Sequence, residues 1–160
     1  MSEKITDNLS YNEVIKTSSK KKNVPSKEQL ANITLWAEKV FQPCRDWARG
    51  EIICNSIFRS AEVNKEKGGS STSEHMANNG SAAGDLEGTT VKNFELFHYI
   101  RKNLVFNQLI AEFPVKGEPS WIHVSYNKDK NKKQILIAKK NKQGKTEYVP
   151  YVGNERLVNI

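Results

Sequence analysis

Residues 73–85 read Ser-Glu-His-Met-Ala-Asn-Asn-Gly-Ser-Ala-Ala-Gly-Asp, a run of small and polar residues with His75 near its start and Asp85 at its end. A second stretch, Trp121-Ile-His-Val-Ser125, contains another histidine, His123. Two imidazoles and a carboxylate are good zinc ligands, and three protein ligands leave the fourth position of a catalytic zinc for water. The two stretches therefore predict one metal site.

The segment around His123 alternates as a β-strand does. Its side chains would fall on two faces, with Trp121, His123 and Ser125 on one and Ile122, Val124 and Tyr126 on the other. Such a strand presents a histidine into a cleft while its other face packs on the core. The third histidine, His98, lies among apolar residues at helical spacing, so we expect it at the edge of the core and outside the metal site.

The length of 160 residues is that of a single domain with a core of its own. The net charge of +7 comes largely from lysines at 20–22 and between 128 and 145. A basic excess favours anionic partners, either nucleic acid or the acidic polymers of a bacterial wall. Aromatic residues are not interleaved with these lysines, which makes a solvated surface a better interpretation than a nucleic-acid site.

Cys44 and Cys54 form no CxxC motif and are expected to be reduced and buried. No apolar run approaches the roughly 18 to 20 residues of a membrane span. The first residues lack the basic and apolar regions of a secretory signal peptide. We therefore expect synthesis in the cytoplasm without a signal peptide, and no membrane span.

The start of the chain predicts a docking segment and linker over residues 1–25, followed by a helix over 26–47. Ser26 and Gln29 have the spacing of a capping box, and apolar residues follow at helical spacing. Pro43 is expected to kink or break this helix because proline has no backbone N–H.

The rest of the chain predicts an α+β fold, in which helices pack on a small antiparallel sheet. Thr89-Thr90 can cap a second helix over 91–103. Strands are expected at 51–58, 104–113 and 121–126, with a hairpin over 132–140 and 146–152. Between them, residues 61–88 predict a long functional loop. The core with the predicted metal site would span 26–126, and a lysine-rich hairpin over 127–160 would extend the same domain.

Six short motifs follow one another along the chain: Ser56-Ile-Phe-Arg59-Ser60, Val63-Asn64, Gly68-Gly69, Ser73-Glu-His75, Phe106-Asn-Gln108-Leu-Ile-Ala-Glu112 and Trp121-Ile-His123-Val-Ser125. Their order and spacing resemble the zinc D-Ala-D-Ala carboxypeptidase and endopeptidase family, which comprises peptidoglycan peptidases of bacteria and phages. The resemblance covers about residues 11–126. It implies a hedgehog-like fold, a bound zinc ion and hydrolysis of an amide bond in peptidoglycan stem peptides or cross-links.

The spacing of the ligands departs from the family pattern. Three more residues than usual separate His75 from Asp85, so we expect a loop insertion between them. Asp85 is the preferred carboxylate ligand because no other aspartate lies nearby, and Glu87 is the alternative.

The catalytic carboxylate is the second departure. Many members carry an acid three residues before the second histidine, where this chain has Ser120. The spacing from Phe106 to Glu112 is similar to the hedgehog branch, which makes Glu112 the expected general base and Glu118 the alternative. Glu112 could instead be a carboxylate at the surface end of a strand.

The resemblance also implies roles for other residues. Arg59 would bind a substrate carboxylate through its planar guanidinium, unless it forms only a surface salt bridge. Gln108 would line the cleft, and Ser73 and Ser125 would orient the ligands at the edge of the substrate site.

Two other classes of protein compete with a peptidase. One is a structural or binding module, for example in a virion, that keeps the fold but has lost activity. The other is a nucleic-acid-binding protein that uses the lysine-rich hairpin. For the peptidase, we expect a phage-encoded enzyme that reaches the wall by cell lysis or within a virion.

Overall fold

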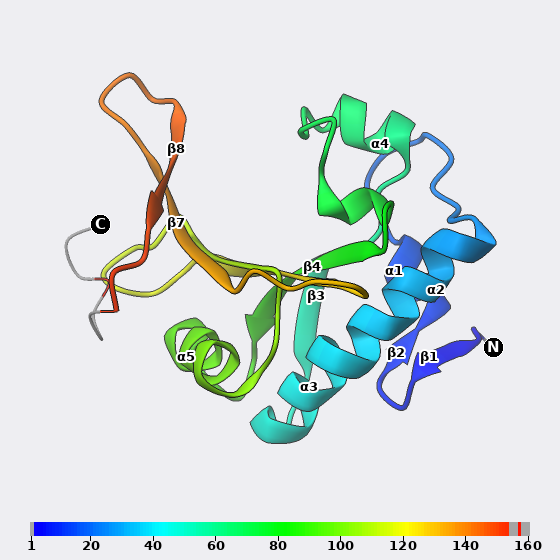
Figure 1. Cartoon of the computed structure of the whole chain (residues 1–160), viewed down its shortest axis with the longest axis horizontal. Coiled ribbons are helices and arrows are strands. Elements are labelled where there is room, and N and C mark those ends of the chain that lie inside the picture. Colours follow the sequence, from blue (N-terminus) through cyan, green and yellow to red (C-terminus); the bar gives the residue numbers. More distant parts are fainter. Residues whose placement is uncertain (1, 154–156, 158–160) are drawn as a thin grey trace.

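A β-sheet with the strand order β3-β4-β6-β5-β7-β8 forms the centre of the computed structural model, which describes residues 2–153 and 157 (Figure 1). The strands are β3 (Ile52–Ser56), β4 (Ser81–Gly88), β5 (Gln108–Glu112), β6 (Trp121–Asn127), β7 (Gln134–Lys140) and β8 (Thr146–Pro150). All neighbouring pairs are antiparallel except β5 and β7. The α+β class is confirmed, but the sheet is mixed, because the chain leaves β6 and returns on the far side of β5.

The register of the sheet aligns side chains from distant parts of the chain. Asp85 on β4 lies opposite His123 on β6, which in turn lies opposite Ile110 on β5. Leu136 on β7 continues the row. Directly opposed residues project from the same side of a sheet, so this row belongs to one face, which we call the site face.

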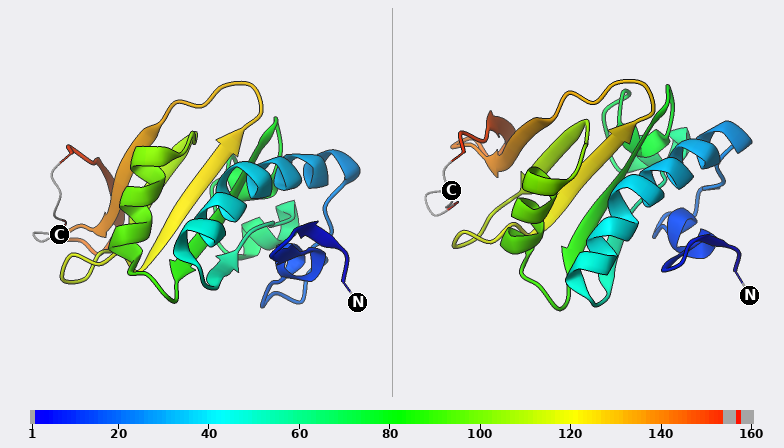
Figure 2. Two further views of the ribbon diagram at one scale, coloured as in Figure 1. Left: turned by 90° about the horizontal axis from the view of Figure 1, so that it is seen from below. Right: turned by 60° about the horizontal axis from the view of Figure 1, so that its bottom comes forward.

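Helices cover the opposite face of the sheet (Figure 2). Trp36 packs there with its indole N–H donating to the Val124 carbonyl at 3.0 Å. A Cβ built on Gly84 would lie 2.4 Å from the Trp36 ring. The position just before Asp85 therefore needs a glycine. The close packing of Trp36 fixes the strand that carries Asp85.

The first long helix begins where the sequence predicts. Ser26 and Gln29 form the capping box, and α2 (Lys27–Trp36) continues through a π-helical turn, η1 (Ala37–Phe41), into α3 (Gln42–Ala48). The prediction of a break at Pro43 is close, but the irregular turn precedes the proline. Because Pro43 has no N–H, the ladder changes register just before it.

The second helix, α5 (Asn93–Asn103), starts later than predicted, with Lys92 as its N-cap. Thr89 and Thr90 do not cap it. Their hydroxyls donate instead to the carbonyls of Glu51 and Ala48. The two threonine hydroxyls therefore bond to carbonyls that are distant in sequence and do not cap the helix.

The predicted long loop over 61–88 is wrong for most of its length. It contains α4 (Ala61–Glu66), a short 3-10 helix, η2 (Glu74–Met76), and all of β4. Ala77, Asn79 and Gly80 have positive φ values of 56°, 54° and 79°, so the backbone turns tightly between η2 and β4. Asp85 itself lies in a strand paired on both sides.

The two ends of the described chain share the central core. At the N-terminus, β2 (Leu9–Ser10) and α1 (Tyr11–Ile15) contribute the buried Leu9 and Val14, and the partly buried Ile5 of β1 (Lys4–Thr6) packs against the core. The C-terminal hairpin, β7 and β8, contributes Ile137, and Leu157 also belongs to the core. The hairpin is confirmed, but its second strand ends at Pro150.

Cys44 and Cys54 are free thiols, of which Cys44 is buried and Cys54 partly buried. Burial raises the pKa of both thiols, so both stay protonated at neutral pH. In the part of the chain that the structure describes, no helix has the length and apolarity needed to cross a membrane.

Candidate metal centre and active site

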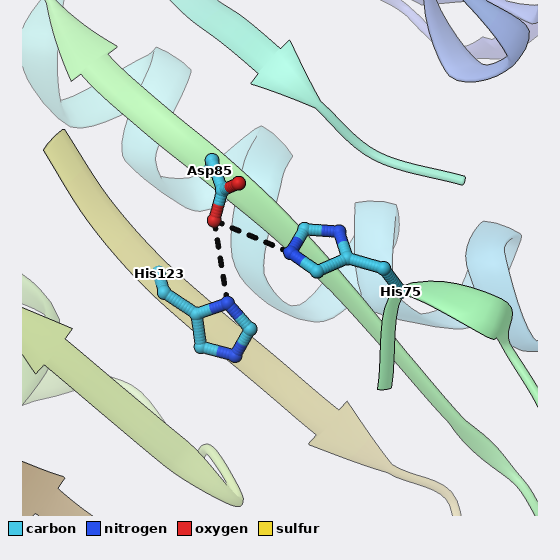
Figure 3. Close-up of side chains that lie close together, drawn as sticks. All are labelled: His75, Asp85 and His123. Carbon is cyan, nitrogen blue, oxygen red and sulfur yellow. Dashed lines mark hydrogen bonds and ion pairs between the residues drawn. The ribbon is translucent and has the colours of Figure 1, made fainter. Parts of the chain in front are cut away.

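Three distant segments bring His75, Asp85 and His123 together. Asp85 and His123 oppose each other on β4 and β6, and η2 carries His75 over the site face (Figure 3). The Arg59 backbone N–H donates to the His75 carbonyl at 2.9 Å, which anchors η2 beside the end of β3. The sequence-predicted ligands thus meet although Asp85 lies in a strand instead of a loop.

The ligand atoms have the spacing of a small metal site. Oδ1 of Asp85 lies 3.3 Å from Nε2 of His75 and 3.3 Å from Nδ1 of His123. All three atoms lie within 4.8 Å of one another. Ligand atoms about 2.1 Å from a tetrahedral zinc lie roughly 3.4 Å apart, so the two shorter separations fit one shared ion.

The orientation of His75 is set by its neighbours. Its Nδ1 lies 2.8 Å from the carbonyl of Ile57, and because a carbonyl only accepts, Nδ1 carries the proton. Nε2, the other ring nitrogen, faces Asp85 and is the atom that could bind a metal. The Ser73 hydroxyl accepts the His75 backbone N–H at 3.3 Å and helps to start η2. A donor fixed by a backbone carbonyl is the usual support of a metal-ligating histidine.

Arg59 lies on the other side of the Asp85 carboxylate. Its Nη2 is 3.5 Å from Oδ2, and its Nε donates to the Ser56 hydroxyl at 3.1 Å. Burial by itself would raise the pKa of Asp85, but His75 and His123 outweigh burial and hold that pKa far below its usual range. Asp85 is therefore a carboxylate, with Oδ1 directed to the histidines and Oδ2 to Arg59.

His123 has an unused polar atom. Among the described residues, its buried Nε2 has no hydrogen-bond partner. Burial alone would lower the pKa of His123, but the hydrogen bond and the charge of Asp85 raise it. A metal ion between Asp85 and His123 would replace the proton on Nδ1 of His123, because a metal binds the neutral imidazole. The donor set and its charge therefore fit a divalent metal ion.

Glu112 lies on the site face at the end of β5, opposite Trp121 of β6. Only 7% of its surface is exposed. Burial raises the pKa of Glu112 to about 7, and the nearby charges of His123, Asp85 and Arg59 modify it in opposing directions. A buried carboxyl with a pKa near neutrality, close to the cluster of His75, Asp85 and His123, has the properties of a general base.

The alternative acids are engaged elsewhere. Glu118 accepts the backbone N–H of Phe94 at 3.1 Å, at the start of α5. Glu87 accepts from the Asn55 side chain at 2.7 Å. Ser120, three residues before His123, donates to the Phe113 carbonyl at 2.8 Å. None of the three is among the residues that line the cleft in the described structure.

A cleft of about 870 Å³ lies over the site face. The predicted residues on its surface are Arg59, Ser73, His75, Asp85, Gln108, Glu112 and His123. Ser125 is fully buried instead, and its hydroxyl accepts the Gln108 backbone N–H at 3.0 Å. This burial argues against the predicted contact of Ser125 with substrate and assigns it to support of β5.

The cleft also contains residues that sequence reasoning did not select. Glu74 accepts a hydrogen bond from Asn107 at 2.9 Å, and Trp121 lies beside Glu112. Tyr148 lines the cleft from the C-terminal hairpin. Alternation in 121–126 placed Trp121 on the face of His123, but no local pattern connects Tyr148 with the site.

The fold and the cleft define the class of protein: an α+β protein whose cleft contains a buried His-Asp-His group that could hold a metal ion, close to a buried glutamate. A model of the family Peptidase M15 matches residues 7–125, and the chain belongs to this family of metallopeptidases. The resemblance read from the short motifs is thereby confirmed. No match was found among curated proteins. The family match ends before β7 and β8 begin.

Proposed function

We propose that the protein is a zinc-dependent peptidase that hydrolyses an amide bond in the stem peptides or cross-links of peptidoglycan. The observation that carries the proposal is the convergence of His75, Asp85 and His123 beside the buried Glu112, in a cleft of a Peptidase M15 chain. Zinc held by the three ligands would polarise the scissile carbonyl and make a bound water more acidic.

The roles of the other residues follow from where they lie. Glu112, as a carboxylate, would accept a proton from water and return it to the leaving amine. Arg59 orients Asp85 and also lines the cleft, so its guanidinium could bind a substrate carboxylate as well. Gln108 donates to Gln134 at 2.9 Å and holds the cleft floor between β5 and β7.

Access to such a substrate requires that the enzyme meet the cell wall. We propose that a phage encodes it and that it reaches the wall by lysis or within a virion. The net charge of +7 would favour contact with acidic wall polymers.

The test is zinc content by elemental analysis, followed by digestion of purified peptidoglycan. We expect about one zinc per chain, lost in the His75→Ala, Asp85→Ala and His123→Ala proteins. His98→Gln is the matched control, because His98 lies on α5 outside the cleft lining. Wild type without zinc, even after zinc is supplied, would overturn the proposal.

A second outcome separates the peptidase from an inactive module of the same fold. Glu112→Gln should bind zinc but release no peptide fragments. If the wild type binds zinc yet leaves peptidoglycan and its cross-linked fragments intact, the protein is a binding or structural module.

A further inference from the structure

The C-terminal hairpin widens the site face beyond the part of the chain that the family model matches. In the register, Glu112 on β5 lies opposite Ala138 on β7, and Ala138 lies opposite Tyr148 on β8. The three residues therefore form one row on the same side of the sheet. Adjacent strands are about 4.8 Å apart, so the backbones of Glu112 and Tyr148 are separated by roughly 10 Å.

Nothing bulky in this row stands between Glu112 and Tyr148, because Ala138 carries only a methyl group. Tyr148 as a residue is 54% exposed, and it lines the same cleft as Glu112. Partial burial, followed by the charges of Glu112 and Asp85, raises the pKa of Tyr148. The phenol is therefore within electrostatic reach of the site and remains a hydrogen-bond donor at neutral pH.

The cleft has two walls of different chemistry. One wall comes from the segment between α4 and η2 and presents the small polar residues Gly69, Ser70 and Thr72. The other comes from the hairpin and presents Leu136, Thr146 and Tyr148. In Figure 1, the hairpin rises at one end of the sheet and α4 stands at the other, with the sheet between them.

The candidate substrate contacts lie at opposite edges of the sheet. Arg59 follows β3, which is one edge strand, and Tyr148 lies on β8, which is the other. Asp85, His123 and Glu112 lie on the strands between these two edges. Six strands span about 24 Å, and extended peptide advances about 3.3 Å per residue, so the face has room for roughly seven residues.

We propose that the hairpin is part of the substrate site, and that Tyr148 binds the arm of a branched or cross-linked peptide that continues beyond the scissile bond. This inference rests on the proposed peptidase function and adds its substrate class. A peptide cut at its end occupies the cleft on one side of Glu112 only. A cross-linked peptide extends across the row and brings a peptide group or side chain onto the Tyr148 ring, which can pack on it and donate from its hydroxyl.

The test measures binding in the zinc-loaded Glu112→Gln protein, which cannot turn over its ligand under the proposed mechanism. Two probes are titrated by calorimetry: a monomeric stem pentapeptide and a cross-linked stem-peptide dimer. We expect the dimer to bind more tightly. Tyr148→Ala should weaken dimer binding about tenfold and bring it close to that of the monomer. Tyr148→Phe should keep the part of the effect that comes from ring packing.

Glu147→Ala is the matched control, because Glu147 is exposed on the same strand but projects from the other face. It should leave the dimer affinity unchanged. If Tyr148→Ala binds the dimer as tightly as its parent, the inference is wrong and the peptidase proposal stands. If the Glu112→Gln parent binds neither probe, the peptidase proposal fails and this inference fails with it.

Discussion

Replacing Glu112 by glutamine should stabilise the metal-free protein at alkaline pH while removing its activity. Glu112 as a residue is 7% exposed, and burial raises the pKa of its carboxyl from 4.5 to about 7. Burial favours the neutral acid because a charge in a poorly solvated site has lost part of its hydration. Glutamine has nearly the same shape and stays neutral at every pH.

The size and sign of the effect follow from proton linkage. Below pH 4.5, Glu112 is mostly neutral in both the folded and the unfolded chain, so its ionisation does not change the free energy of unfolding. Between about 4.5 and 7, the unfolded chain ionises first, so the folded state loses stability as the pH rises. Above pH 7 the loss is complete and amounts to about 3 kcal/mol. Glutamine avoids it.

The assay is urea unfolding with chelator present, at pH 4.5 and pH 8.5, for the wild type and Glu112→Gln. The difference in unfolding free energy should grow by about 2 to 3 kcal/mol in favour of glutamine at the higher pH. Glu62→Gln is the control, because Glu62 is an exposed carboxylate on α4. An equal difference at both pH values would refute the assignment of Glu112 as a buried, destabilising base.

Four further outcomes are expected. The rate of hydrolysis should increase with pH as Glu112 ionises. The midpoint of this increase should lie at or below about pH 7, because a bound cation lowers the pKa of the carboxyl. A rate that stays constant from pH 4 to 8 would count against Glu112 as the base. Zinc at 100 times its Kd should stabilise the wild type by about 2.7 kcal/mol in urea titrations, and His75→Ala should show no such gain. Gly84→Ala should cost about 1 to 3 kcal/mol in thermal melts, because its Cβ meets the Trp36 ring at 2.4 Å. Ser26→Ala should cost about 1 kcal/mol by loss of the helix cap, and an unchanged melting temperature would contradict that role.

Features with local causes were predictable from the sequence. The capping box of Ser26 and Gln29 was predicted because both partners lie within one helical turn. The alternation that placed His123 on the face of Trp121 was also confirmed, because a strand imposes its period of two on neighbouring residues. The identity of the clustered ligands followed from the chemistry of the side chains themselves.

Features with distant causes were predicted incorrectly or not at all. The segment Ser81-Ala-Ala-Gly-Asp85 has little intrinsic preference for a strand, and it becomes one because β6 pairs with all of it and β3 pairs with its last residue, Asp85, on the other side. Thr90 was expected to cap a helix, but the Ala48 carbonyl lies within 2.8 Å of its hydroxyl in the fold. Local secondary-structure propensity is overridden where neighbouring strands or a distant carbonyl provide better hydrogen-bond partners for the backbone and side chains.

By itself the sequence indicated which side chains are candidates to bind a metal or carry a proton: His75, Asp85, His123 and Glu112, with Glu87 and Glu118 as alternatives. It could do so because ligand and acid–base chemistry belong to individual side chains. Only the tertiary structure decided that burial would raise the pKa of Glu112 and that Tyr148 would share its cleft. Both depend on strand pairing across the sheet, where the register of β5, β7 and β8 sets distances that no spacing along the chain contains.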